Sequence, residues 1–181
     1  MNFRRLLPSG LFTLVVALFV TLASSALADA MVFTGDGVRT KSVGPFSANV
    51  YAIRHDMKEK PATKSKQAVI EADIDKKFTW RMLRDVESSK IRKALTEALQ
   101  MNGFNEDGRT KQFVGAFSQE EVKEKATVVI SYNAAAKTVT IWVAGGGSAT
   151  IAGQDFMKAV WSIWLGRIDQ PSLGDKLISQ L

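Results

Sequence analysis

The sequence contains no cysteine and a single histidine, His55, among its 181 residues. Without cysteine the fold cannot be held by disulfides, and thiol catalysis is excluded. One histidine and no cysteine leave no set of ligands typical of a zinc site. We therefore expect stability to come from side-chain packing, and we expect neither a metal ion nor a cofactor.

Long apolar runs are also scarce, and the clearest one, residues 11–22, lies behind two arginines close to the N-terminus. Small residues follow it, which predicts a signal peptide over residues 1–28 with cleavage after Ala28 or, as second choice, after Ala30. The run is short for a membrane span, so an uncleaved anchor is the weaker alternative. The mature chain, residues 29–181, is expected to be periplasmic or otherwise exported.

A strong excess of one charge is lacking too, since the basic balance is mild. The chain has 24 basic and 18 acidic residues, and removing the two arginines of the predicted signal lowers the formal charge from +6 to +4. The basic residues are interspersed with acids, which indicates a solvated surface and no nucleic-acid partner. About 150 residues would remain, enough for one domain with its own core.

Alternation of apolar and polar residues predicts several strands, with turns at Gly35-Asp36-Gly37, at Gly44-Pro45 and at Asp75-Lys76. The predicted strands cover residues 38–43, 46–55, 67–74, 77–84, 127–132, 138–143 and 148–152. Helical spacing predicts one helix that begins at Ser88 or Ser89 and ends at Gly103. It predicts three more over residues 111–116, 154–165 and 171–181. A capping box at residues 118–121 predicts one more short helix. The resulting class is α+β.

The helix predicted over residues 154–165 is apolar on nearly every side, since two sets of large side chains repeat every four residues. They are Phe156, Val160 and Trp164, and Met157, Trp161 and Leu165. Such a helix must be covered by the rest of the fold, so we place it against the sheet. Its aromatic residues are expected in the core, and walling an apolar pocket is the alternative.

Two predicted strands carry an apolar face. In residues 46–55 this face is formed by Phe46, Ala48, Val50 and Ala52. In residues 77–84 it is formed by Phe78, Trp80 and Met82 and ends at Arg84. An arginine that completes an apolar face either holds an anion in a cleft or extends to the solvent at the rim.

Four motifs in this order resemble bacterial chalcone isomerase-like proteins. They are GDGVRTK at residues 35–41, the strand at 46–53, LRDV at 83–86, and IAGQDF at 151–156 running on to WLG at 164–166. The resemblance implies the chalcone isomerase fold, an open-faced β-sandwich in which a large antiparallel sheet is backed by helices.

Plant enzymes of this fold cyclise chalcones with an arginine, a threonine, a tyrosine and an asparagine. The resemblance places the arginine at Arg39. It puts Phe46 at the threonine, Glu87 at the tyrosine and Ala94 at the asparagine. Only the arginine is retained, so cyclisation is not the first expectation.

Other members of this family bind fatty acids, with the same arginine meeting the carboxylate. The resemblance therefore implies a ligand site around Arg39, although from the residue alone a surface ion pair with a nearby acid is the alternative. We expect Arg39 and Arg84 to provide charge and the apolar strand faces to line a cleft for the tail. The complete predicted site is Arg39, Phe46, Ala48, Val50, Trp80, Met82 and Arg84.

We therefore expect a non-catalytic protein that binds a small amphipathic anion such as a fatty acid. The first alternative is an isomerase (intramolecular lyase) acting on a phenolic or enone substrate, with Tyr51, Tyr132 or Glu87 as replacement donors. The second alternative is a structural or partner-binding envelope protein, which exposed apolar patches around the final helix would favour.

Overall fold

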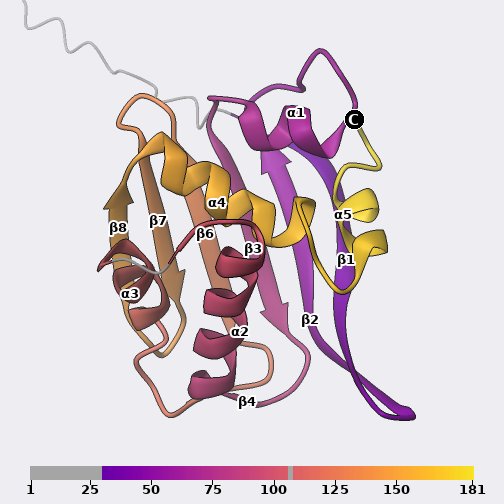
Figure 1. The fold of residues 1–181 in the computed structure, drawn as a ribbon, viewed down its shortest axis with the longest axis vertical. Coiled ribbons are helices and arrows are strands. Elements are labelled where there is room, and N and C mark those ends of the chain that lie inside the picture. The colour runs from indigo at the N-terminus through magenta and orange to yellow at the C-terminus, as the bar shows by residue number, and fades with distance from the viewer. Residues whose placement is uncertain (1–29, 106–107) are drawn as a thin grey trace, which may run out of the picture.

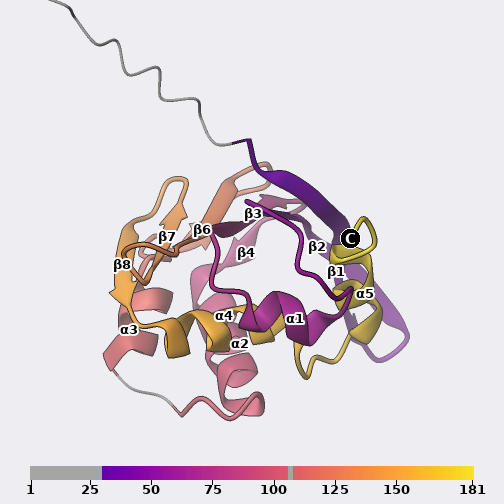
Figure 2. The same cartoon turned by 90° about the horizontal axis from the view of Figure 1, so that it is seen from above.

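The computed structural model describes residues 30–105 and 108–181, and the predicted signal peptide lies outside the described residues. One large antiparallel sheet carries the described helices on a single face (Figures 1 and 2). Its strands, in spatial order, are β1 (Val32–Val43), β2 (Phe46–Met57), β3 (Lys76–Met82), β6 (Thr127–Asn133), β7 (Thr138–Val143) and β8 (Ser148–Ala152). The helices are α1 (Lys66–Glu71), α2 (Ser88–Met101), α3 (Gly108–Gly115), α4 (Gln154–Leu165) and α5 (Pro171–Leu177). This confirms the predicted α+β open-faced sandwich.

Helix α4 lies where its apolar sequence predicted, across the inner face of the sheet (Figure 1). Trp161 and Trp164 both pack on Phe78 of β3, with ring centroids 5.2 and 4.7 Å away. The helix follows Gly153, whose φ of +123° is one that glycine adopts without strain. Burial of large aromatic side chains makes this contact the centre of the hydrophobic core.

A chain of buried hydrogen bonds joins α4 to three other elements. Trp161 Nε1 donates to His55 Nε2 at 2.9 Å, so the proton of the neutral imidazole lies on Nδ1, which is 2.7 Å from Thr34 Oγ1. Thr34 Oγ1 in turn donates to the carbonyl oxygen of Leu177 at 2.9 Å. Burial and the nearby charge of Lys76 lower the pKa of His55 to about 3, which keeps the ring neutral.

Helix α1 replaces the strand that was predicted over residues 67–74, and that prediction was wrong. The Ser65 side chain accepts a hydrogen bond from the Ala68 amide at 3.0 Å, which caps the first turn. The helix then buries Val69 and Ile70, two consecutive residues that would lie on opposite faces of a strand. The local alternation of small apolar residues was therefore a misleading signal.

The buried side chain of Lys76 caps the C-terminal end of α1. Its ammonium donates to the carbonyl oxygens of Val69 at 2.6 Å, Ile70 at 3.2 Å and Ala72 at 2.8 Å. It also lies 5.0 Å from the ring centroid of Trp161. Burial lowers the pKa of Lys76 to about 7. The turn predicted at Asp75-Lys76 was wrong, because Lys76 begins β3 and its side chain holds the end of the helix.

The turn predicted at Gly35-Asp36-Gly37 was also wrong, because these residues lie inside β1. Gly35 is required there for space: a Cβ would lie 2.1 Å from the Lys176 carbonyl oxygen of α5. Its φ of +154° coincides with a shift of register between Phe33 and Gly35. The glycine thus allows α5 to pack on the strand.

A second shift of register changes which face of β2 is buried. Arg39 pairs with Tyr51 and Thr40 with Asn49, so Val50 is bulged out between them. Beyond the bulge Ile53, His55 and Met57 are buried on one face, with Tyr51 partly buried above them, and Asp56 is buried as well. The predicted apolar face of Phe46, Ala48, Val50 and Ala52 was therefore wrong, since one extra residue reverses the alternation.

The remaining connections agree with the sequence in most places. The turn at Gly44-Pro45, helices α2, α3 and α5 and the hairpin between β6 and β7 are confirmed. The capping box at residues 118–121 instead leads into β5 (Glu121–Val122), which pairs with β4 (Val86–Glu87). Across residues 30–105 and 108–181, no helix has the length and apolar character that crossing a bilayer requires.

Stability should depend on pH through His55. Its folded pKa lies below the unfolded value near 6.5, so the stability that it contributes is present above pH 6.5 and is lost as the pH falls toward 3. Between pH 6.5 and 5 the free energy of unfolding should fall with a slope approaching about 1.4 kcal/mol per pH unit. Urea titrations across this range measure the slope. A flat profile, or an equal slope in His55→Gln, would contradict the neutral buried imidazole.

Replacing Lys76 tests the closure of α1. Lys76→Met keeps much of the aliphatic volume and leaves three helix-terminal carbonyls without their shared donor. We expect a loss of about 2 kcal/mol in the free energy of unfolding. Urea denaturation measures this, with Lys77→Met on the opposite face of the same strand as control. Equal stability of the two variants would show that the buried ammonium contributes nothing.

Candidate functional site

The seven residues predicted for the site do not form one cleft. Trp80 and Met82 are fully buried under the helices, whereas Phe46 is 79 % exposed at the tip of the β1–β2 hairpin. This tip extends beyond the helical layer (Figure 1), which leaves Ala48 only partly covered. Val50 lies at the bulge of β2. Arg84 is exposed and follows the end of β3, as in the rim interpretation.

Of the predicted residues, Arg39 is the one whose charged group is bound by several polar side chains. It points to the helix-covered side of β1, and its side chain is 17 % exposed. Its Nη2 is 2.6 Å from Asp169 Oδ1, and its Nη1 donates to Gln170 Oε1 at 3.2 Å. Both partners belong to the connection between α4 and α5, so the guanidinium joins the first strand to the C-terminal part of the chain.

The anionic partner of this site is itself stabilised by two cations. Lys41, two residues after Arg39 on the same face of β1, lies 3.1 Å from Asp169 Oδ2. Burial alone would raise the pKa of the Asp169 carboxyl, but the hydrogen bonds from Lys41 and Arg39 outweigh it and lower the pKa. The site therefore holds a carboxylate in its ionised form.

Tyr51 lies beside Arg39 across the strand pair. Its ring stacks on Trp80 with centroids 4.5 Å apart, and its hydroxyl oxygen accepts a hydrogen bond from Trp164 Nε1 at 3.0 Å. Burial raises the pKa of Tyr51 to about 12, although the Trp164 hydrogen bond and the Arg39 charge act in the opposite direction. Tyr51 therefore keeps its proton, and its hydroxyl remains able to donate a hydrogen bond.

An aromatic wall of Tyr51, Trp80 and Trp164 continues from this polar group into the core. Trp80 and Trp164 are each 1 % exposed, and their ring centroids are 5.3 Å apart. The indole nitrogen of Trp80 is buried, and within the described residues it has no hydrogen-bond partner. A buried donor without a partner is costly and uncommon.

The other donors considered for catalysis lie elsewhere. The Tyr132 hydroxyl donates to Asp73 at 2.7 Å, and burial together with this carboxylate raises the pKa of Tyr132. Glu87 ends β4 before α2 and pairs with Lys90 at 2.6 Å. The described residues hold no group of three or more metal-ligating side chains. Of the three substitutes, Tyr51 alone is a direct strand partner of Arg39.

The sequence did not predict which residues are the partners of Arg39. Counting outward from the Gly44-Pro45 turn pairs Arg39 with Val50, and the bulge moves the partner by one residue to Tyr51. Asp169 and Gln170 lie in the connection after α4, and no periodic pattern there predicts which way their side chains point. The acidic character of Asp169 was a usable signal, because a surface ion pair with a nearby acid was the alternative for Arg39.

The fold is an open-faced sandwich, and its candidate site places the Arg39 cation beside an aromatic wall. A family model described as chalcone isomerase-like matches residues 20–177, and the chain belongs to that family, as its motifs predicted. A solved fatty-acid binding protein of Arabidopsis thaliana (AtFAP1) superposes with a TM-score of 0.67 over 83 % of this chain and 87 % of that one. Their identity is 14 %, so the likeness shows the fold alone. No curated protein sequence matches the chain significantly.

The raised pKa of Tyr51 can be measured directly. A tyrosine with a folded pKa above the unfolded value of about 10 adds stability that is present below pH 10 and lost as the pH rises toward 12. We expect the folded protein to show almost no tyrosinate absorbance at 295 nm up to pH 11, because the pKa of Tyr132 is raised as well. One tyrosine that titrates near pH 10 in the folded chain, and disappears in Tyr51→Phe, would contradict this geometry.

Proposed function

We propose that this protein binds a small amphipathic anion, with a fatty acid as the leading class, and does not catalyse its conversion. The observation that carries this proposal is the largely buried guanidinium of Arg39, which already binds a carboxylate and has Tyr51 as its partner on the neighbouring strand. A carboxylate head would occupy the same position. The aromatic wall behind the site is the apolar surface along which a tail would lie after local rearrangement.

The electrostatics of the site favour an anionic head over a neutral one. A guanidinium and a carboxylate form strong, directional hydrogen bonds, and partial burial at Arg39 strengthens them. Tyr51 adds a protonated donor that remains neutral throughout the physiological range. The fatty-acid binding described for the structural neighbour supports the choice of ligand class.

Isomerase activity remains a second candidate, because Tyr51 and Arg39 face the same space. Arg39 would stabilise a phenolate, and the Tyr51 hydroxyl would donate to an enone oxygen. Conversion of a chalcone to a flavanone, lost in Tyr51→Phe, would favour it over simple binding. The partner-binding alternative receives less support, since the large exposed apolar residues of the described chain lie outside α4 and α5. They are Phe46, Leu83, Met101 and Trp142.

The N-terminal pattern of two arginines, an apolar run and small residues supports export to the periplasm as part of the same proposal. Cleavage after Ala28 or Ala30 would leave the sandwich intact, because β1 begins at Val32. Mass spectrometry of the protein from its own envelope identifies the first residue. Recovery of the uncleaved chain in the membrane would instead support the anchor.

The ligand can be sought on the same sample. Native mass spectrometry followed by organic extraction should recover a fatty acid or a similar anion from the purified protein. Arg39→Gln should weaken binding of hexadecanoate by about tenfold to hundredfold, because it removes the cation and leaves a neutral amide as the hydrogen-bond donor.

Arg54→Gln provides the matched control, since Arg54 is an exposed arginine on β2 that pairs with Asp56 at 2.6 Å. It should bind hexadecanoate like the wild type. An empty protein that binds no fatty acid, or equal binding by the two arginine variants, would refute Arg39 as the head-group site.

A further inference from the structure

The connection between α4 and α5, residues 166–170, brings a carboxylate of the chain itself to Arg39. Asp169 binds the Nη2 atom of Arg39 at 2.6 Å and Lys41 at 3.1 Å. The second terminal nitrogen of the guanidinium, Nη1, donates to Gln170. The guanidinium that would attract a ligand is therefore already paired with an internal anion, which Lys41 shares.

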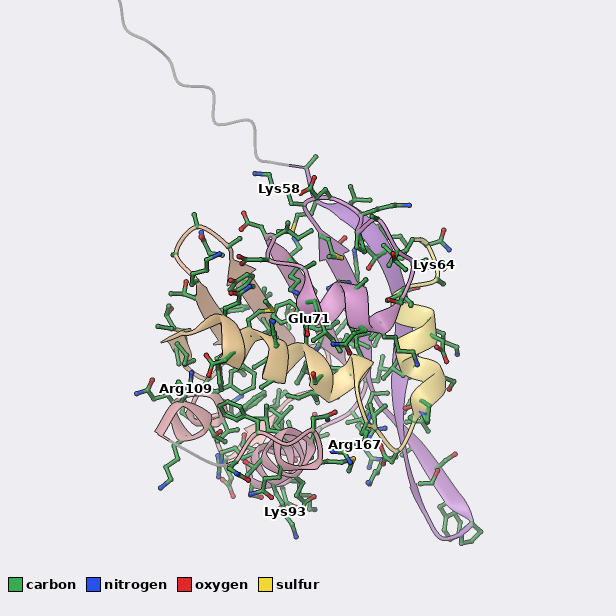
Figure 3. The ribbon with its side chains drawn as sticks, turned by 45° about the horizontal axis from the view of Figure 1, so that its top comes forward. Lys58, Lys64, Glu71, Lys93, Arg109 and Arg167 are labelled. Atoms are coloured by element: carbon green, nitrogen blue, oxygen red, sulfur yellow. The ribbon has the colours of Figure 1, made fainter. Side chains whose placement is uncertain are left out.

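The connection is held firmly on both sides of Asp169. Before it, the Asn102 side chain accepts from the Arg167 amide at 2.7 Å and donates to the Arg167 carbonyl at 3.0 Å. Figure 3 labels Arg167 where the connection leaves α4. After it, Gln170 accepts from the Thr40 amide and donates to the Val38 carbonyl, both at 3.0 Å. The backbone is thus anchored independently of the Asp169 carboxylate.

Because the anchors do not involve Asp169, its side chain can leave Arg39 without release of the whole connection. The carboxylate is 48 % exposed, so water can solvate it after it moves. The guanidinium is much more buried and would then need another anion. A ligand carboxylate satisfies that need, whereas a neutral head group leaves Arg39 unpaired.

We propose that Asp169 determines specificity as an internal competitor for the head-group position of the ligand. It reduces affinity for every ligand that must displace it, and it favours ligands whose own charge replaces the lost ion pair. This inference rests on the proposed function of Arg39. It adds that the affinity and charge selectivity of the site are set by a residue that need not touch the bound ligand.

Asp169→Asn tests this, because it removes the charge and keeps the size of the side chain. Hexadecanoate should bind about fivefold to tenfold more tightly than to the wild type, since the apparent affinity is no longer reduced by competition. Hexadecan-1-ol should gain less. Fluorescence displacement titrations measure both ligands, and circular dichroism verifies that the variant is folded.

Asp155→Asn is the matched control. Asp155 is also an exposed aspartate that pairs with an arginine, Arg109, at 2.9 Å, but it lies in the first turn of α4 and not in the connection between α4 and α5. It should leave hexadecanoate affinity unchanged. In the double variant Arg39→Gln/Asp169→Asn, the gain from Asp169→Asn should disappear, because the competition acts through Arg39.

The outcomes separate the inference from the function on which it rests. If hexadecanoate binds the wild type and is lost in Arg39→Gln, but Asp169→Asn gives no gain, the competitor role is wrong and the proposed function stands. A gain that persists in the double variant would also overturn it, because Asp169 would then act through general loosening of the connection. If no variant binds the probe, both ideas are wrong.

Discussion

The packing of α4 on the sheet is the interaction on which the rest of this structure depends. Trp161 and Trp164 fill the space above Phe78, and each also donates a hydrogen bond, to His55 and to Tyr51 respectively. Aromatic burial supplies the driving force, and the two indole N–H groups give the helix one position on the strands. The orientation of Tyr51 is therefore determined by the same contact that forms the core.

The position of the polar site follows from this core together with one irregularity in β2. The bulge at Val50 brings Tyr51 opposite Arg39, and both residues lie on the side that the helices cover. The end of α4 then directs the chain back to β1, where Asp169 and Gln170 meet the guanidinium. Charge is thus placed next to a buried aromatic wall, and because the chain has no cysteine no disulfide takes part.

The sequence predicted the parts of the fold where a single strong period operates. Helix α4 was predicted from Gln154 to Leu165, as the structure has it, because its apolar repeat is long and glycines bound it. Prediction failed where tertiary contacts override local pattern, as at Gly35, which approaches α5, and in α1, which Lys76 closes from another element. Arg39 was identified through the family resemblance. Tyr51 was named as a replacement donor for an isomerase, but its pairing with Arg39 was not predicted, and neither was Asp169, since a bulge and a long-range ion pair leave no local periodic signal.

Hexadecanoate labelled with ¹³C at its carboxyl carbon offers the most direct test of a carboxylate held at Arg39. The carboxyl resonance of the bound ligand, followed by NMR as the pH is lowered, reports the pKa of the head group in the site. A guanidinium partner with an adjacent hydroxyl donor predicts a bound pKa well below that of an unperturbed carboxyl group, and a return toward the ordinary value in Arg39→Gln. A bound carboxyl that titrates alike in both proteins would contradict the central claim.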